Sequence, residues 1–216
     1  MIFAGLDVAT VTGLAAIDGE KVTTATYRSP KKKGDVFGDA DKSGKIDAIH
    51  TGAIGVGFED YLRSWLIANR VTHAAVEMPI RSNATRTKTT VDPQARFAGK
   101  AIHKETVAIT SMATIYRLYG LSFLALTVCA RLQIPCRLVN QSEWRKAFLG
   151  TGTTKDAKQS AVVQCKRLGI AYSSVDACEA LGIAWYLRGE LSPANYRQAN
   201  NLFNLPPTTG EPSSRG

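Results

Sequence analysis

The stretch that decides the fold is MIFAGLDVATVTGLAAI, residues 1–17. Its two apolar runs, 2–6 and 14–17, have the composition of buried strands, and the Thr- and Gly-containing segment between them is typical of a turn. Asp7 stands where the first run ends. A carboxylate beside buried apolar residues is costly unless it has a partner. The rest of the chain must therefore explain why Asp7 is there.

The elements expected along the chain alternate between strand and helix. Strands are predicted at 1–9, 13–18 and 21–28, as an antiparallel meander, and again at 73–78 and 135–140. Helices are predicted over 51–69, 96–132, 142–148, 155–168 and 174–189. This order predicts an α/β fold in which a mixed sheet is flanked by helices.

The length of the chain suits one compact domain, because 216 residues that are 44% hydrophobic can bury a sizeable core. We expect the domain to span 1–199, with a polar insertion rich in Gly, Lys and Asp at about 29–45. Residues 200–216 are rich in Pro, Ser, Thr and Gly, which is typical of a flexible tail.

Cysteine and histidine usage argues against a zinc site, since the four cysteines form no C-x-x-C pair and the three histidines show no ligand spacing. Three of the cysteines lie in apolar helical segments, where a free thiol acts as a small hydrophobic side chain. We therefore expect a reducing compartment and no disulfides. The most apolar stretch, 118–130, is shorter than the roughly 20 residues that span a bilayer, and the first residues read as a strand rather than a signal peptide. We therefore expect a cytoplasmic protein without a membrane partner.

Positive charge is concentrated in one third of the chain. The net charge is +9, and residues 81–150 hold 11 Lys and Arg against three acids, which accounts for +8 of it. Such a field attracts polyanions, so we expect a nucleic-acid partner; solvated Lys and Arg on an ordinary basic protein are the alternative. The residues expected to contact nucleic acid are Arg81, Arg86 and Lys88 in the polar segment 81–95, followed by Arg96 and Phe97. Phe97 would stack on an unpaired base; a place in the core is the alternative.

Three further acids lie, like Asp7, at the ends of apolar elements. Glu77 ends the buried strand 73–78, and Asp176 and Glu179 share one face at the start of a helix. If the strands at 1–7 and 73–78 pair in parallel, Asp7 and Glu77 emerge side by side, and the helix can present the other two acids to them. Four close carboxylates repel one another, and Mg²⁺ relieves that repulsion with oxygen ligands alone.

Two such ions about 4 Å apart would activate a water and stabilise the leaving oxygen of a phosphodiester. Each acid also has a purely structural interpretation: Asp7 could begin a turn with Thr10, Glu77 could pair with a buried arginine, and the helical acids could complement the helix dipole. The four acids together, in this order, favour a metal site.

Four segments resemble the RuvC family of Holliday-junction resolvases, members of the ribonuclease H-like superfamily. GLDVATVTGLAAI is similar to the family's first strand and hairpin, and AAVEMP to the strand that carries its second acid. LGTGTTKDAKQSAVVQ resembles the Gly-containing loop and basic helix before the last motif, and DACEALGIAWYL resembles the final D-x-x-D/E helix. Divergent phage-type members look more similar than the housekeeping bacterial type, which implies a bacterial or phage-infected cell and association with the nucleoid.

The resemblance implies a ribonuclease H-like fold with three antiparallel plus two parallel strands, and a homodimer that cuts four-way DNA junctions. It implies two Mg²⁺ per site, with Mn²⁺ as a substitute, held by Asp7, Glu77, Asp176 and Glu179, with Asp7 shared between them. It further implies a basic residue at the scissile phosphate, which is Lys155 or Lys158, and a second phosphate contact from Arg145 or Lys146.

The dimer surface expected from the sequence is the apolar helical region 100–132. Its segment IYRLYGLSFLALTVCARL has more apolar residues than one buried helix face requires. A helix covered on all sides in a monomer is the alternative.

Departures from the family keep other functions open. Val8-Ala9 replaces the usual Pro-Gly after the first acid, and the loop after Glu77 is long and rich in Thr and Arg. A nuclease for flaps or RNA–DNA hybrids and a non-catalytic nucleic-acid-binding module of the same fold are the two alternatives.

The basic segment generates a prediction about salt. Replacing Arg86 and Lys88 together by alanine should lower the slope of log affinity against log salt concentration by roughly one unit per lost phosphate contact. DNA binding measured across a salt series checks this, and an unchanged slope would place the binding surface elsewhere.

Overall fold

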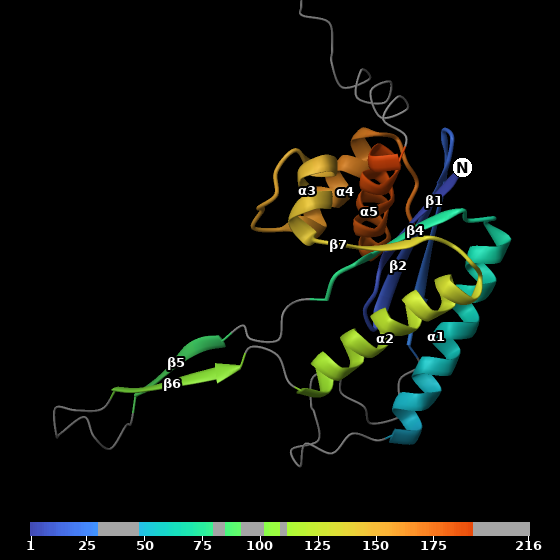
Figure 1. Ribbon diagram of the computed structural model, residues 1–216. Helices are drawn as coiled ribbons and strands as arrows, with labels where there is room; N and C mark the ends of the chain where they lie inside the picture. The colour runs from blue at the N-terminus through green and yellow to red at the C-terminus, as the bar shows by residue number, and fades with distance from the viewer. Residues whose placement is uncertain (30–47, 80–84, 92–101, 109–111, 192–216) are drawn as a thin grey trace, which may run out of the picture.

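A five-stranded mixed sheet in the order β3-β2-β1-β4-β7 forms the centre of the protein (Figure 1). The computed structural model describes residues 1–29, 48–79, 85–91, 102–108 and 112–191. The meander consists of β1 (Ile2–Asp7), β2 (Val11–Asp18) and β3 (Lys21–Arg28), while β4 (His73–Glu77) and β7 (Cys136–Val139) run parallel to β1. The predicted fold class, with three antiparallel and two parallel strands, is confirmed.

Helices cover both faces of this sheet, and the strands β1, β2 and β4 are accordingly buried over most of their length. One face carries α1 (Ala48–Ala68) and α2 (Met112–Arg131), and the other carries α3 (Gln141–Leu149), α4 (Ala157–Arg167) and α5 (Val175–Leu191). Successive residues of a strand point to opposite faces. In β1, Leu6 accordingly belongs to the core under α1 and α2, whereas Phe3 belongs to the core under α5.

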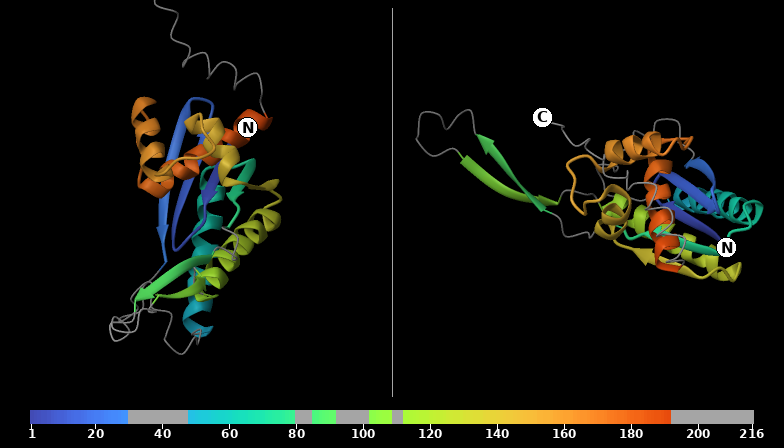
Figure 2. Two further views of the ribbon diagram at one scale, coloured as in Figure 1. Left: turned by 90° about the vertical axis from the view of Figure 1, so that its left-hand side faces the viewer. Right: turned by 90° about the horizontal axis from the view of Figure 1, so that it is seen from above.

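The segment between β4 and α2 differs from the prediction. The helix expected over 96–132 begins only at Met112, and β5 (Thr85–Val91) pairs with β6 (Ile102–Ala108) as an antiparallel ribbon before it. This ribbon projects from the body of the protein (Figure 2). The sequence TRTKTTV is rich in β-branched residues, which favour strands. The predicted helix is therefore wrong over Ile102–Ala108, because the apolar helical pattern of α2 does not extend to these residues.

The apolar segment 118–130 forms most of α2 and contributes to the core through Ala125, Val128 and Cys129. Across the described parts of the chain, no helix has both the length and the apolar character needed to cross a membrane. Nearly all of the predicted insertion at 29–45 and the whole tail at 200–216 fall outside the described residues.

Two glycines bring α5 into direct contact with the sheet. A Cβ atom at Gly5 would lie 2.0 Å from the carbonyl oxygen of Ala180, and one at Gly13 would lie 2.0 Å from that of Asp176. Side chains cannot be accommodated at such distances, so the helix backbone lies on the strands at these two points. Because Gly13 is paired with Asp7 across β1 and β2, the second contact also brings Asp176 close to Asp7.

The packing of α5 generates a prediction about stability. Gly5→Ala should lower the free energy of unfolding by about 3 kcal/mol or more, because the new methyl group meets backbone atoms that cannot move aside. Gly52→Ala is the matched control: Gly52 is helical and its Cβ would meet nothing within 4 Å, so it should add about 0.5–1 kcal/mol. Urea unfolding measures both, and a Gly5→Ala variant as stable as the wild type would contradict the packing.

Candidate active site

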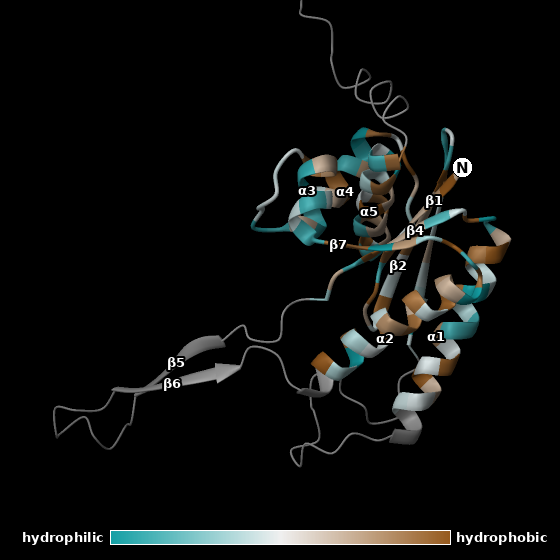
Figure 3. Ribbon diagram, in the orientation of Figure 1, coloured by the Kyte–Doolittle hydropathy of each residue, from teal (hydrophilic) through white to brown (hydrophobic). Residues whose placement is uncertain are grey.

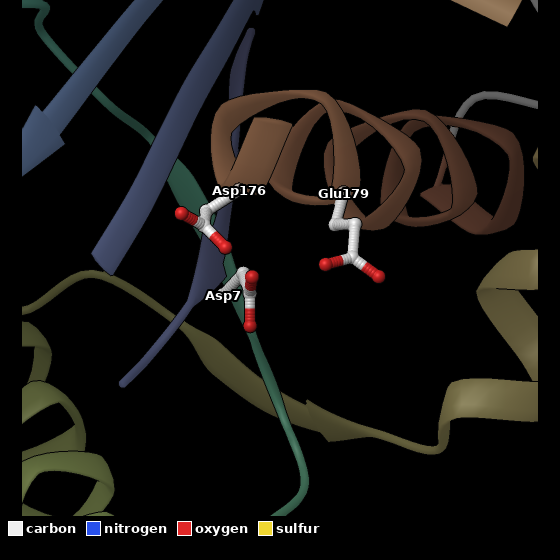
Figure 4. A group of neighbouring side chains, drawn as sticks. All are labelled: Asp7, Asp176 and Glu179. Carbon is white, nitrogen blue, oxygen red and sulfur yellow. The ribbon is translucent and has the colours of Figure 1, made fainter. Parts of the chain in front are cut away.

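Three of the four predicted acids converge at the end of β1. A carboxylate oxygen of Asp7, one of Asp176 and one of Glu179 all lie within 4.8 Å of one another. Figure 4 shows the two helical side chains descending from α5 toward Asp7. The predicted parallel pairing of β1 with β4 is present, with Leu6 opposite Val76. Asp7 and Glu77 therefore emerge from adjacent strand ends.

Glu77 lies beside this group. It is not one of the three acids within 4.8 Å of one another, but it lines the same pocket as Asp7 and is close enough for its charge to raise the pKa of Asp7. Only 9% of Glu77 is exposed. One of its oxygens, Oε1, accepts a hydrogen bond of 3.2 Å from the indole Nε1 of Trp144, a residue that the sequence analysis did not single out.

The turn after Asp7 is closed by Thr12 rather than by Asp7 itself. The buried Thr12 hydroxyl donates to the carbonyl oxygen of Ala9 at 2.7 Å and accepts from the Ala9 amide at 3.3 Å. With this turn stabilised by a threonine, the Asp7 carboxylate is left to face the other acids.

The start of α5 is fixed to the sheet by hydroxyl groups. Ser174 caps the helix, since its Oγ accepts from the backbone N–H of Ala177 at 3.1 Å. Thr26 of β3 donates to the same Oγ at 2.6 Å. Ser173 precedes the cap, and its hydroxyl lies 2.9 Å from the Thr26 hydroxyl.

The acids perturb one another's ionisation. Burial raises the pKa of Asp7 well above its ordinary value, and the charges of Glu77 and Glu179 raise it further. Burial also raises the pKa of Glu179 from 4.5 to about 7, against the opposing attraction of Lys158. The arrangement therefore holds negative charge at a cost, as expected of a site prepared for a cation.

The acids share a cavity of about 450 Å³ with a basic wall. This wall consists of Lys155, Lys158 and Arg145, which line the cavity together with Asp7, Glu77 and Glu179. Lys158 forms ion pairs with Asp176 and, at 3.6 Å, with Glu179. Burial disfavours the charge of Lys158, but contact with Asp176 outweighs this and raises its pKa overall.

The arrangement of these elements matches that of solved RuvC structures. A Thermus thermophilus RuvC structure aligns with 93% of this chain and 97% of its own, at a TM-score of 0.53 and 16% identity. T. thermophilus RuvC in complex with a Holliday junction substrate aligns with 89% and 96%, at a TM-score of 0.54 and 13% identity. The chain has a RuvC-like fold. No protein-family model and no curated protein matches its sequence.

Within the RuvC-like fold, the predicted basic residues and Phe97 fall into four groups. Lys155, Lys158 and Arg145 line the acidic pocket, whereas Lys146 is exposed in the last turn of α3 and does not. Arg86 and Lys88 lie on β5, whose side chains are outside the description. Arg81, Arg96 and Phe97 lie outside the described residues altogether. Their roles stay predictions.

The donor set of this RuvC-like site fits a divalent metal ion. All the converging donors are carboxylate oxygens, which hard cations prefer. The raised pKa values of Asp7 and Glu179 arise from burial and mutual repulsion, both of which a cation would offset. Asp7, Glu77, Asp176 and Glu179 are the residues that would hold it.

The acids generate a prediction about pH. Because the pKa of folded Glu179, about 7, exceeds its ordinary value of 4.5, the folded state retains a proton that the unfolded state releases. Its contribution to stability is complete below pH 4.5 and is lost as the pH rises through about 7. In EDTA, the wild type should therefore melt at a lower temperature at pH 7.5 than at pH 5.5.

Glu179→Gln is the control for this prediction, since it removes the titrating group and should flatten the pH dependence. Mg²⁺ should raise the melting temperature more at the higher pH, where protons compete less for the acids. Melting temperatures that depend equally on pH in both proteins would assign the effect to other groups.

Proposed function

We propose that this protein is a metal-dependent endonuclease that cleaves four-way DNA junctions. The observation that carries the proposal is the convergence of Asp7, Asp176 and Glu179, with Glu77 beside them, at one edge of a RuvC-like sheet. One of the solved structures with a similar fold is RuvC in complex with a Holliday junction substrate, which makes branched DNA the substrate to test first.

The acids would hold two Mg²⁺, with Mn²⁺ as a substitute. Asp7 has Glu77 at the adjacent strand end on one side and lies within 4.8 Å of the helical acids on the other, so it would be the ligand shared by both ions. Bound in pairs, such ions activate an attacking water and stabilise the leaving oxygen of a phosphodiester. The strand ends and the capped helix hold the ligands in place, since each acid lies on a regular element.

Lys158 is the better candidate for the basic residue at the scissile phosphate. Both Lys155 and Lys158 line the pocket, but Lys158 is the one whose ammonium group pairs with Asp176 and Glu179. When cations take these oxygens, its charge is released toward an incoming phosphate. Arg145 lines the same wall, and its buried Nε has no hydrogen-bond partner, so it is the better candidate for the second phosphate contact.

The proposed chemistry predicts the effect of removing each acid. Asp7→Asn and Glu77→Gln should each abolish Mg²⁺-dependent cleavage of a four-way junction, because an amide is a poor ligand for the cation. DNA binding should be retained or tightened, since both changes remove negative charge from the site. Gel assays of cleavage and binding on junction, flap, duplex and RNA–DNA hybrid substrates measure both effects.

Asp18→Asn is the matched control, because Asp18 is exposed at the opposite end of β2 from the site; it should leave cleavage unchanged. Near-wild-type turnover by either active-site variant would overturn the metal-site assignment. Cleavage of flaps or hybrids in preference to junctions would retain the nuclease and reject the junction as its substrate.

A second part of the proposal is a homodimer formed through α2. Cutting two opposed strands of a junction calls for two sites related by a dyad. Hydrophobic residues lie along α2 (Figure 3), and two aromatic residues spaced by two turns are exposed there, Tyr116 by 65% and Phe123 by 70%. An exposed aromatic stripe of this kind is typical of an interaction surface.

The dimer predicts a change of mass on substitution. Sedimentation at micromolar concentration should show a dimer for the wild type and a monomer for Phe123→Glu, because the introduced charge would be buried in the interface. Val56→Glu is the control, since Val56 is an exposed apolar residue of α1. A wild type that is monomeric with and without junction DNA, yet cuts both strands, would refute the paired-site arrangement.

A further inference from the structure

The indole of Trp144 is joined to an acid of the site. Its Nε1 donates a hydrogen bond of 3.2 Å to Oε1 of Glu77, and the contact is buried on both sides. A hydrogen bond to an ionised acceptor is among the stronger ones in proteins. A tryptophan N–H that is buried needs a partner, and here that partner is a proposed metal ligand.

The ring of Trp144 has little freedom to move. A Cβ atom at Gly182 would lie 2.6 Å from Cε3 and 2.8 Å from Cζ3 of the indole, so α5 lies directly against the ring. Phe148, which lies on α3 with Trp144, also packs against Gly182: its Cδ1 would lie 3.0 Å from the same Cβ atom. The helix that carries Asp176 and Glu179 thus also fixes the side chain that contacts Glu77.

We infer that Trp144 is a positioning residue that orients Glu77 for metal binding. With Oε1 accepting from the indole, the other carboxylate oxygen of Glu77 is left for the cation that Asp7 shares. The inference rests on the proposed metal site but adds a residue that touches neither metal nor DNA. The indole N–H is the group that carries this role. Phenylalanine supplies a comparable apolar ring without an N–H, so Trp144→Phe removes the hydrogen bond alone.

The direct test is Mg²⁺ binding by the full chain carrying Trp144→Phe, measured by calorimetric titration with MgCl₂ alone. Loss of a group that hydrogen-bonds a metal ligand typically weakens metal affinity 10- to 100-fold, and we expect a loss of about tenfold here. Trp65→Phe is the matched control, since Trp65 is a buried tryptophan in the core on the other face of the sheet; its affinity should equal that of the wild type.

A second readout is tryptophan emission. Adding MgCl₂ should change the emission of the wild type and of Trp65→Phe, because the charge next to the Trp144 indole changes. The response should disappear in Trp144→Phe. Thermal unfolding of each variant shows whether the fold is retained.

A double-mutant cycle separates positioning from packing. If Trp144 acts through Glu77, Trp144→Phe should weaken Mg²⁺ binding in the wild type and have no further effect in a Glu77→Gln background. Equal losses in both backgrounds, or wild-type affinity in folded Trp144→Phe, would overturn the inference. A wild type that binds no Mg²⁺ would overturn it together with the metal site.

The two proposals fail differently. If the wild type binds Mg²⁺ and the cycle shows coupling, but no branched DNA is cleaved, the positioning role of Trp144 stands and the proposed activity falls.

Discussion

The direct contact of α5 with β1 and β2 is the constraint on which the site depends. At Gly5 and Gly13 the helix backbone rests on the strands with no side chain between them. Gly13 is paired with Asp7 in the sheet and touches the backbone of Asp176. The main-chain positions of these two acids are therefore fixed relative to one another by direct backbone packing, and close-packed interiors yield little.

The packing of α5 also offsets the repulsion among the acids. From Ala177 to Ala184 every residue of this helix is buried, so most of its length is surrounded by protein. Glu179 is only 4% exposed and lies in a cluster of acids that repel one another. Burial of apolar surface on all sides of the helix stabilises its position against that repulsion. Sites that hold groups in unfavourable surroundings commonly depend on such rigid support.

The strands of the sheet and the positions of the acids at strand ends could be predicted from the sequence, because both follow from simple periodicities. Apolar runs that end in Asp7 and Glu77 mark strand ends, and the parallel pairing of those strands brings the ends together.

The role of Trp144 could not be predicted from the sequence, because helical spacing with Phe148 predicts a buried ring but not the direction of its N–H. The sequence also could not decide between Arg145 and Lys146, because adjacent residues point to different sides of a helix. Which side of α3 faces the pocket depends on how α3 is oriented, and the sequence does not specify this. The ribbon of β5 and β6 was missed because threonine-rich alternation carries a weak signal.

The order in which the acids occur along the chain has a consequence for biosynthesis. Asp7 and Glu77 lie in the first two-fifths of the 216 residues, whereas Asp176 and Glu179 arrive with α5. During translation the sheet edge is exposed without the helix that completes the pocket, and long-range contacts of this kind form late. A nascent or truncated chain thus carries half of the carboxylates and cannot assemble the centre. An unfinished chain would therefore lack the acidic centre on which the proposed activity depends.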